Sequence, residues 1–120
     1  MRVAIVGSRN FTDYGRFERA VDESLTKFGY ARCEQLVSGG ARGVDTLVER
    51  YARERDIELR VFAADWSTHG RAAGPIRNAQ IEQYATHAIA FPSRNGRGTQ
   101  DTMRRFARSG KPLEVHWIDD

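Results

Sequence analysis

The sequence predicts an α/β fold, a three-layer sandwich in which helices cover both faces of a mostly parallel, five-stranded sheet. Two observations predict this fold, namely the spacing of apolar residues along the chain and the order in which the resulting strands and helices follow one another. Short apolar runs, typical of buried strands, alternate with longer segments whose apolar residues recur at helical spacing. Strands that alternate with single helices indicate right-handed βαβ units. With 120 residues, 40% hydrophobic and 29% charged, the chain has the size and composition of one globular domain spanning residues 1–120.

The first half of the chain contains two strand–helix pairs. Residues 2–6 form an apolar run that predicts a buried strand, and residues 14–28 follow a helical period that Gly29 would end. Residues 34–37 predict the second strand. The clearest helix covers residues 43–55, where apolar side chains recur at i, i+3, i+4, i+7 and i+8, namely Val44, Leu47, Val48, Tyr51 and Ala52.

The second half continues the alternation. Proline is well tolerated at the first helical position, so Pro75 is expected to begin a helix that ends near Ala85. Its side chains Ile76, Ala79 and Tyr84 are expected to face the core. The other elements predicted here are strands at 58–62, 87–91 and 113–117, a loop at 63–73, a turn at 92–98, a helix at 99–109 that Gly110 closes, and a solvated tail at 119–120.

Composition excludes several classes of protein. The single cysteine, Cys33, rules out an intrachain disulfide framework and a multi-cysteine zinc site, and neither a metal site nor a cofactor is predicted. No run approaches 18 apolar residues, so we expect no transmembrane helix and no membrane partner. Residues 1–6 enter strand-like sequence without a signal-peptide pattern, which favours a cytoplasmic location.

The formal net charge of +3 is modest. The basic residues are unusual, however, because 17 of the 19 are arginine. Arginine is suited to bidentate contacts with phosphate and carboxylate groups. The alternative is a compositional bias that fills the solvated surface with arginine.

The unusual residues of the chain gather in the loops that follow strands. The carboxyl ends of parallel strands form one edge of the sheet, where α/β proteins bind their ligands. After the first strand come Gly7, Ser8 and Arg9, of which Ser8 and Arg9 can donate hydrogen bonds to an anion. The alternative is an ordinary turn before a helix capped by Asp13.

The loop after the second strand places three glycines within five residues, directly before a helix N-terminus. Bare amides and the positive end of a helix dipole favour an anion there. The glycine spacing is neither a Walker loop nor G-x-G-x-x-G. Asp45 lies in the first helical turn, where its role is either in the site or in stabilising the helix. The candidate ligand-binding residues that precede Asp45 in this loop are Ser38, Gly39, Gly40, Arg42 and Gly43.

The loop after the third strand is long for a strand-to-helix connection, which is typical of functional loops. It contains Asp65, Trp66 and His69. Trp66 either stacks on a base or anchors the core, and His69 either contacts a phosphate, acts as a base or has a structural role. Arg77 and Asn78 follow at the start of the next helix.

The loop after the fourth strand leads through Gly98 and Thr99 into a helix that carries Asp101. Four such loops at the same edge of the sheet predict a crevice that binds an anion with polar groups, such as a nucleotide or a sugar phosphate.

These motifs resemble the YspA-type, YpsA-related branch of the SLOG superfamily. The resemblance is carried by Gly7-Ser8-Arg9, by residues 38–45 and 64–78, and by Gly98-Thr99, and covers roughly residues 2–115. It implies a Rossmann-like fold that binds a nucleotide or a derivative resembling ADP-ribose, NAD or a nucleoside phosphate, as a sensor or sequestering domain. It also implies a homo-oligomer. Enzymatic LOG members carry a glutamate after their Gly-Thr pair, whereas here the nearest carboxylate is Asp101.

Two other functions stay open. One is hydrolysis of a nucleotide N-glycosidic bond, as in LOG phosphoribohydrolases, for which Asp45, Asp65, His69 and Asp101 are the candidate acids or bases. The other is single-stranded DNA binding, because residues 38–45 are also similar to the glycine-arginine-glycine turn of DprA. The bases could then stack on Trp66, Phe11 and Tyr14.

Overall fold

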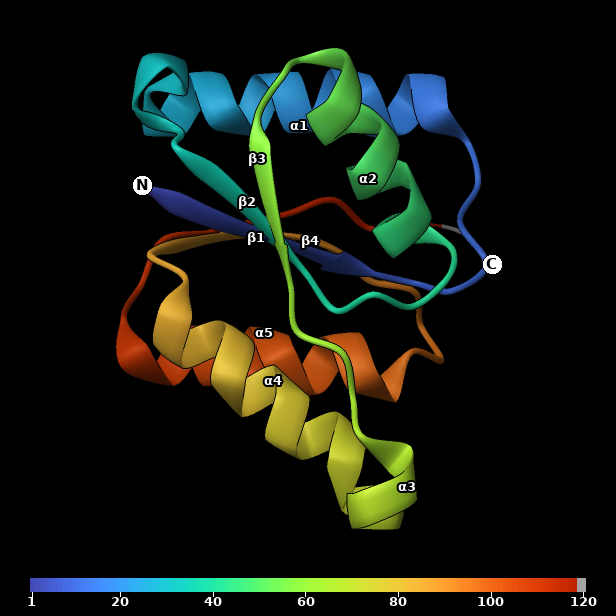
Figure 1. Cartoon of the computed structure of the whole chain (residues 1–120). Coiled ribbons are helices and arrows are strands. Elements are labelled where there is room, and N and C mark those ends of the chain that lie inside the picture. The colour runs from blue at the N-terminus through green and yellow to red at the C-terminus, as the bar shows by residue number, and fades with distance from the viewer. Residues whose placement is uncertain (119–120) are drawn as a thin grey trace.

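A computed structural model describes residues 1–118, and its centre is one fully parallel sheet. The predicted α/β architecture is confirmed (Figure 1). The strand order is β3-β2-β1-β4-β5, so the chain builds outward from β1 in one direction and then reverses to build in the other. The strands are β1 (Arg2–Gly7), β2 (Gln35–Ser38), β3 (Glu58–Val61), β4 (His87–Phe91) and β5 (Leu113–Val115).

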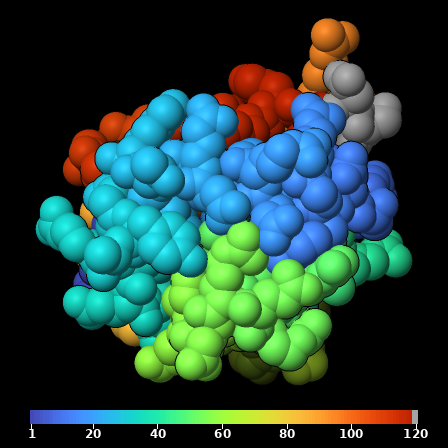
Figure 2. Space-filling view, turned by 90° about the horizontal axis from the view of Figure 1, so that it is seen from above, coloured from blue at the N-terminus to red at the C-terminus, as the bar shows by residue number. Residues whose placement is uncertain are grey.

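Helices cover both faces of this sheet, as Figure 1 shows, and α1 and α2 together cover one face (Figure 2). Asp13 begins α1 by accepting a hydrogen bond from the Arg16 amide at 3.1 Å, and Gly29 ends it in a left-handed conformation with φ of 98°. The helices are α1 (Tyr14–Phe28), α2 (Val44–Glu54), α3 (Trp66–His69), α4 (Ala73–Tyr84) and α5 (Arg97–Ser109), with short 3₁₀ turns η1 (Tyr30–Arg32) and η2 (Gly70–Ala72).

The two sides of the sheet bury different amounts of apolar surface. Alternating side chains of β1 separate them, with Ile5 facing α1 and α2 and Ala4 facing α4 and α5. All five apolar residues that predict the helix at 43–55 are buried in the α1/α2 layer. The α4/α5 layer is built on small residues, because Ala4 pairs in register with Ala88 of β4 and both pack beneath Phe106 and Ile81.

Three sequence expectations differ from the structure. The expected loop at 63–73 contains α3 and η2, and α4 begins at Ala73, so that Pro75 is its third residue. Proline fits there because the first four helical amides have no partner within the helix. The expectation that Ile76 faces the core is wrong, since the side chain is 38% exposed. The first turn of α4 projects away from the sheet with α3 (Figure 1), which leaves Ile76 exposed although Ala73 in the same turn is buried.

Smaller differences concern element ends. The helix α5 begins at Arg97, two residues earlier than expected, and β5 ends at Val115, where its pairing with Ala90 of β4 also ends. The expected tail at 119–120 lies outside the described residues. Within residues 1–118, no helix is long and apolar enough to cross a membrane.

Candidate functional site

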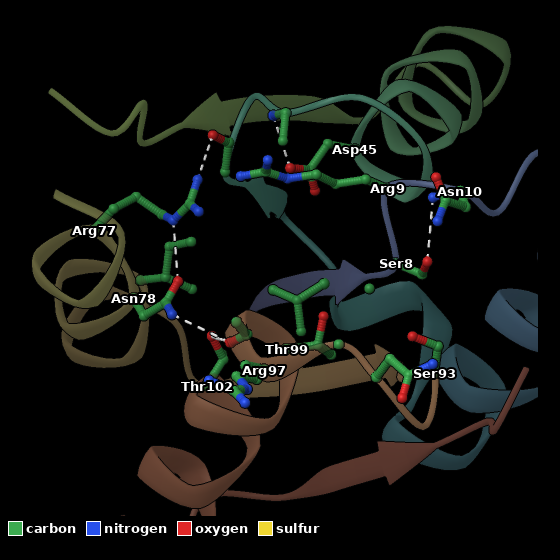
Figure 3. A pocket seen from close by; sticks show the side chains of 18 residues that line it. Ser8, Arg9, Asn10, Asp45, Arg77, Asn78, Ser93, Arg97, Thr99 and Thr102 are labelled. Atoms are coloured by element: carbon green, nitrogen blue, oxygen red, sulfur yellow. Dashed lines mark hydrogen bonds between the residues drawn. The ribbon is translucent and has the colours of Figure 1, made fainter. Parts of the chain in front are cut away.

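The main pocket lies where the strand order reverses. The strands β2 and β3 lie on one side of β1, and β4 and β5 on the other, so the loops that follow β1 and β4 lead away from each other. The pocket between them has a volume of about 330 Å³ and is lined by the loops after β1, β2 and β4, by α4 and by the start of α5 (Figure 3). Ligand sites in proteins range over ~300–1,000 Å³, so it is large enough for a small ligand group.

The glycine-rich loop after β2 is held against the loop after β1. Gly43 has φ of 73°, a conformation that L side chains rarely adopt, and a Cβ built on it would overlap the backbone of Arg9. The next amide, that of Val44, donates to the Ser8 carbonyl at 3.1 Å. Gly43 is therefore required for the two loops to approach each other, which brings the N-terminus of α2 to the pocket.

Two helix N-termini at this pocket have no side-chain cap within residues 1–118. The N-cap residues are Gly43 for α2 and Gly96 for α5, and neither supplies a side-chain hydrogen bond. By contrast, Asp13 caps α1. At α2 the Val44 and Thr46 amides already donate to the Ser8 and Gly43 carbonyls. The start of α5, where Arg97, Gly98 and Thr99 line the pocket, is therefore the helix N-terminus that favours an anion there.

Asp45 lies on the pocket wall and is only 8% exposed. Its Oδ2 atom accepts a hydrogen bond from the Ala41 amide at 2.8 Å, which closes the glycine-rich loop over the first turn of α2. Burial raises the pKa of this carboxyl group, although the Ala41 amide and the nearby Arg77 charge act in the opposite direction. Asp45 thus contributes both to the loop and to the electrostatics of the pocket.

Arg77 reaches from α4 across the pocket to the glycine-rich loop (Figure 3). Its Nη1 atom donates to the Gly39 carbonyl at 2.7 Å, and its Nε atom donates to Asn78 Oδ1 at 3.0 Å. A Cβ built on Gly39 would overlap the guanidinium group, so a larger residue there would have to displace Arg77. Burial lowers the pKa of Arg77, and the positive charge of Arg9 adds to this effect. Two arginines therefore face the same space.

Asn78 joins α4 to the start of α5. Its Nδ2 atom donates to the Gly98 carbonyl at 3.2 Å and to Asp101 Oδ2 at 3.1 Å. Arg105 also donates to Asp101 Oδ2, at 3.0 Å. Burial acts to raise the pKa of Asp101, but the hydrogen bonds from Arg105 and Asn78 outweigh it and lower that pKa. Asp101 is thus a held, ionised anchor behind the pocket and not part of its lining.

The structure brings most of the predicted site residues together. Those on the wall of the main pocket are Gly7, Ser8, Arg9, Gly39, Asp45, Arg77, Asn78, Gly98 and Thr99. Gly40 and Trp66 line a smaller cavity beside it. Ser38 lies buried beneath the glycine-rich loop, where its Oγ atom accepts from the Gly40 amide at 3.2 Å.

Three predicted residues lie outside both cavities and are exposed, namely Arg42, Asp65 and His69. Asp65 is the N-cap of α3, because its Oδ1 atom accepts from the Thr68 amide at 3.2 Å and from Ser67 Oγ at 2.9 Å. These hydrogen bonds lower its pKa. Trp66 is 52% exposed, which excludes the alternative that it anchors the core.

Sequence reasoning missed several residues of the main pocket. Ile81 and Thr102 lie one helical turn after predicted residues of α4 and α5, so helical spacing could have found them. Ser93, Asn95 and Gly96 belong to the loop after β4, and Arg97 is the first residue of α5. The others are Val6, Asn10 and Ala41.

Within residues 1–118, no three His, Cys, Asp or Glu side chains are placed to share a metal ion.

The chain resembles known proteins in two ways. Residues 1–69 match the model of the YspA, cpYpsA-related SLOG family. These residues contain the loops after β1 and β2 and reach Trp66, whereas Arg77 and Thr99 lie beyond them. Over 118 residues the chain is also 33% identical to the Gene 61 protein of Mycobacterium phage D29, an alignment that covers 93% of each chain.

Proposed function

Because this chain belongs to the YspA, cpYpsA-related SLOG family, in which small-molecule binding is expected, we propose that its main pocket binds the phosphate-bearing part of a nucleotide or nucleotide derivative. The ligand class is that of ADP-ribose, NAD or a nucleoside phosphate. The protein would act as a sensor or a sequestering domain, a role that needs binding but no turnover.

One observation carries this proposal. The side chains of Arg9 and Arg77 and the uncapped N-terminus of α5 meet at one pocket. Among the described residues of its wall, Asp45 is the only carboxylate, and it already accepts the Ala41 amide. Donors and positive charge therefore predominate, which favours a phosphate group.

A binding titration with two matched arginine variants tests the proposal. Both Arg9 and Arg42 are exposed, but only Arg9 lines the pocket. We expect Arg9→Ala to weaken binding of AMP or ADP-ribose about 10- to 150-fold, because a charge-assisted hydrogen bond contributes about 1.5–3 kcal/mol. Arg42→Ala removes the same charge outside the pocket and should leave the dissociation constant within about twofold.

Isothermal titration calorimetry gives the dissociation constants, and circular dichroism checks that both variants fold. Wild-type protein that binds neither AMP nor ADP-ribose at millimolar concentration would refute the proposal. Equal losses in the two variants would refute the assignment of the pocket. A short single-stranded DNA in the same series tests the DprA-like alternative, since its affinity should fall steeply with salt.

Asp45 favours hydrolysis as a second candidate function. It is a carboxyl group on the wall of the pocket, and burial raises its pKa, which is the behaviour expected of a general acid. Chromatographic detection of free adenine released from AMP tests this function. Release by the wild type that is abolished in Asp45→Asn would support it, and absence of release by the wild type would end it.

A further inference from the structure

We propose that the cavity beside Trp66 is a second subsite, which takes the aromatic base of a nucleotide while the main pocket takes its phosphate-bearing part. The inference rests on the proposed function and deepens it, because it states that the ligand has two chemically different ends. A sugar phosphate without a base would fill only half of the site.

The two cavities are neighbours that share a wall. The second has a volume of about 250 Å³ and is lined by eight residues, of which Arg9, Gly39, Ala41 and Arg77 also line the main pocket. A ligand that extends from one cavity into the other therefore passes along a wall that includes both arginines. Phosphate is the group that suits this position, since the guanidinium of Arg77 is held by the Gly39 carbonyl and by Asn78.

The lining of the second cavity differs from that of the main pocket. Beyond the shared wall it consists of Gly40, Ala63, Ala64 and Trp66, so it has small residues around one large aromatic ring and no acidic or hydroxyl side chain. The main pocket, by contrast, has Ser8, Ser93, Thr99 and Thr102 on its wall. The part of the second cavity beyond the shared wall, where an indole lies among small residues, is suited to an aromatic base, and the hydroxyl-rich main pocket to sugar and phosphate groups.

Trp66 is exposed yet held in position. It is the first residue of α3, whose start is fixed by the Asp65 cap described above. The far edge of the indole ring, atom Cη2, lies beside Gly74 in the first turn of α4, 3.5 Å from where a Cβ on that glycine would be. A large aromatic side chain that is 52% exposed and lies on the wall of a cavity is available for stacking.

The chain provides its own control for this residue. Trp117 is the only other tryptophan, is 57% exposed and lines neither cavity. A Trp117→Phe variant therefore keeps Trp66 as the single tryptophan, so that its fluorescence reports on the second cavity alone.

The experiment compares AMP with ribose 5-phosphate, which lacks the base. In the Trp117→Phe protein, AMP should quench the Trp66 emission and ribose 5-phosphate should not. By calorimetry, Trp66→Ala should weaken AMP binding about 5- to 150-fold, the range that base–aromatic stacking provides, and should leave ribose 5-phosphate unchanged. Trp117→Ala should leave both probes unchanged.

The possible failures are distinguishable. If AMP binds and depends on Arg9 but neither quenches Trp66 nor responds to Trp66→Ala, the second subsite is refuted and the proposed function stands. Equal weakening of AMP and ribose 5-phosphate by Trp66→Ala also refutes it, because the tryptophan would then only support the pocket. If neither probe binds to the wild type, the proposed function and the subsite are both refuted.

Discussion

Asp45 is placed where two requirements of the site oppose each other. Its carboxylate closes the glycine-rich loop through the Ala41 amide, but its burial disfavours the negative charge. The result is a pKa raised above the usual value of about 3.9 for aspartate. A single residue therefore couples the shape of the loop to the protonation state of the pocket.

This raised pKa predicts how stability depends on pH. A folded-state pKa above the unfolded one adds stability below the unfolded pKa, and that stability is lost as pH rises through the folded pKa. Asp45→Asn keeps an oxygen for the Ala41 amide and removes the charge. We expect its free energy of unfolding to equal or exceed that of the wild type at pH 7, with the difference shrinking towards pH 4.

Urea unfolding followed by circular dichroism at several pH values between 4 and 7 measures this difference. As a control, Asp13→Asn changes an exposed carboxyl group outside the pocket, at the cap of α1. A loss of more than about 1 kcal/mol in Asp45→Asn at pH 7 would show that its charge is needed for the fold.

At the scale of elements, the junction of α4 and α5 forms one side of the pocket. The link is Asn78, a buried amide that donates to the Gly98 carbonyl and to Asp101. The helices would otherwise meet through few large side chains, because the core on their side of the sheet is built largely on alanine. The position of the uncapped α5 N-terminus thus depends on a polar contact.

Replacing Asn78 by alanine should therefore affect both stability and binding. We expect Asn78→Ala to lower the free energy of unfolding by about 1–3 kcal/mol, since two hydrogen bonds are lost, to the Gly98 carbonyl and to Asp101, each worth about 0.5–1.5 kcal/mol. AMP binding should weaken as well, because Gly98 and Thr99 line the pocket. The control is Gln80→Ala, at an exposed position of the same helix. Urea unfolding and calorimetry measure the effects, and equal results for the two variants would contradict this role.

At the scale of the whole molecule, the two layers of helices differ in how firmly they are held. The α1/α2 layer includes tilted and edge-to-face rings, with the Phe17 centroid 5.1 Å from that of Phe91 and 6.2 Å from that of Tyr51. The buried core of the α4/α5 layer comprises Ala4, Val37, Ile81, Ala85, Ala88 and Phe106. Less buried apolar surface means a lower free energy of local opening.

Hydrogen exchange should reveal this difference. We expect amides of α1 and α2 to exchange at least about tenfold more slowly than those of α4, which corresponds to about 1.4 kcal/mol of opening free energy. Native-state exchange followed by mass spectrometry of peptic fragments tests it. Equal protection of the two layers would show that the whole domain opens as one unit. The homo-oligomer that the family resemblance implies stays a prediction at this scale.

Sequence patterns predicted the elements well where local burial produces them. The helix α2 follows from five apolar residues at helical spacing, all of which are buried. The exposure of Ile76 could not be predicted in the same way, because an apolar residue on a helix faces the core only if that turn lies over the sheet. Likewise, α3 is a single turn held by the Asp65 cap and has too few residues for a periodic pattern.

By itself, the sequence determined the alternation of strands and helices and the presence of glycine-rich and arginine-bearing loops at the carboxyl ends of strands, because these are local properties of the chain. The tertiary structure decided which loops meet, since the reversal of strand order at β1 depends on contacts between distant segments. It brought Arg77, 38 residues along the chain, to the Gly39 carbonyl, and left Arg42 outside the pocket. It also placed the exposed ring of Trp66 beside a second cavity, because three separate loops and the start of α4 pack together there.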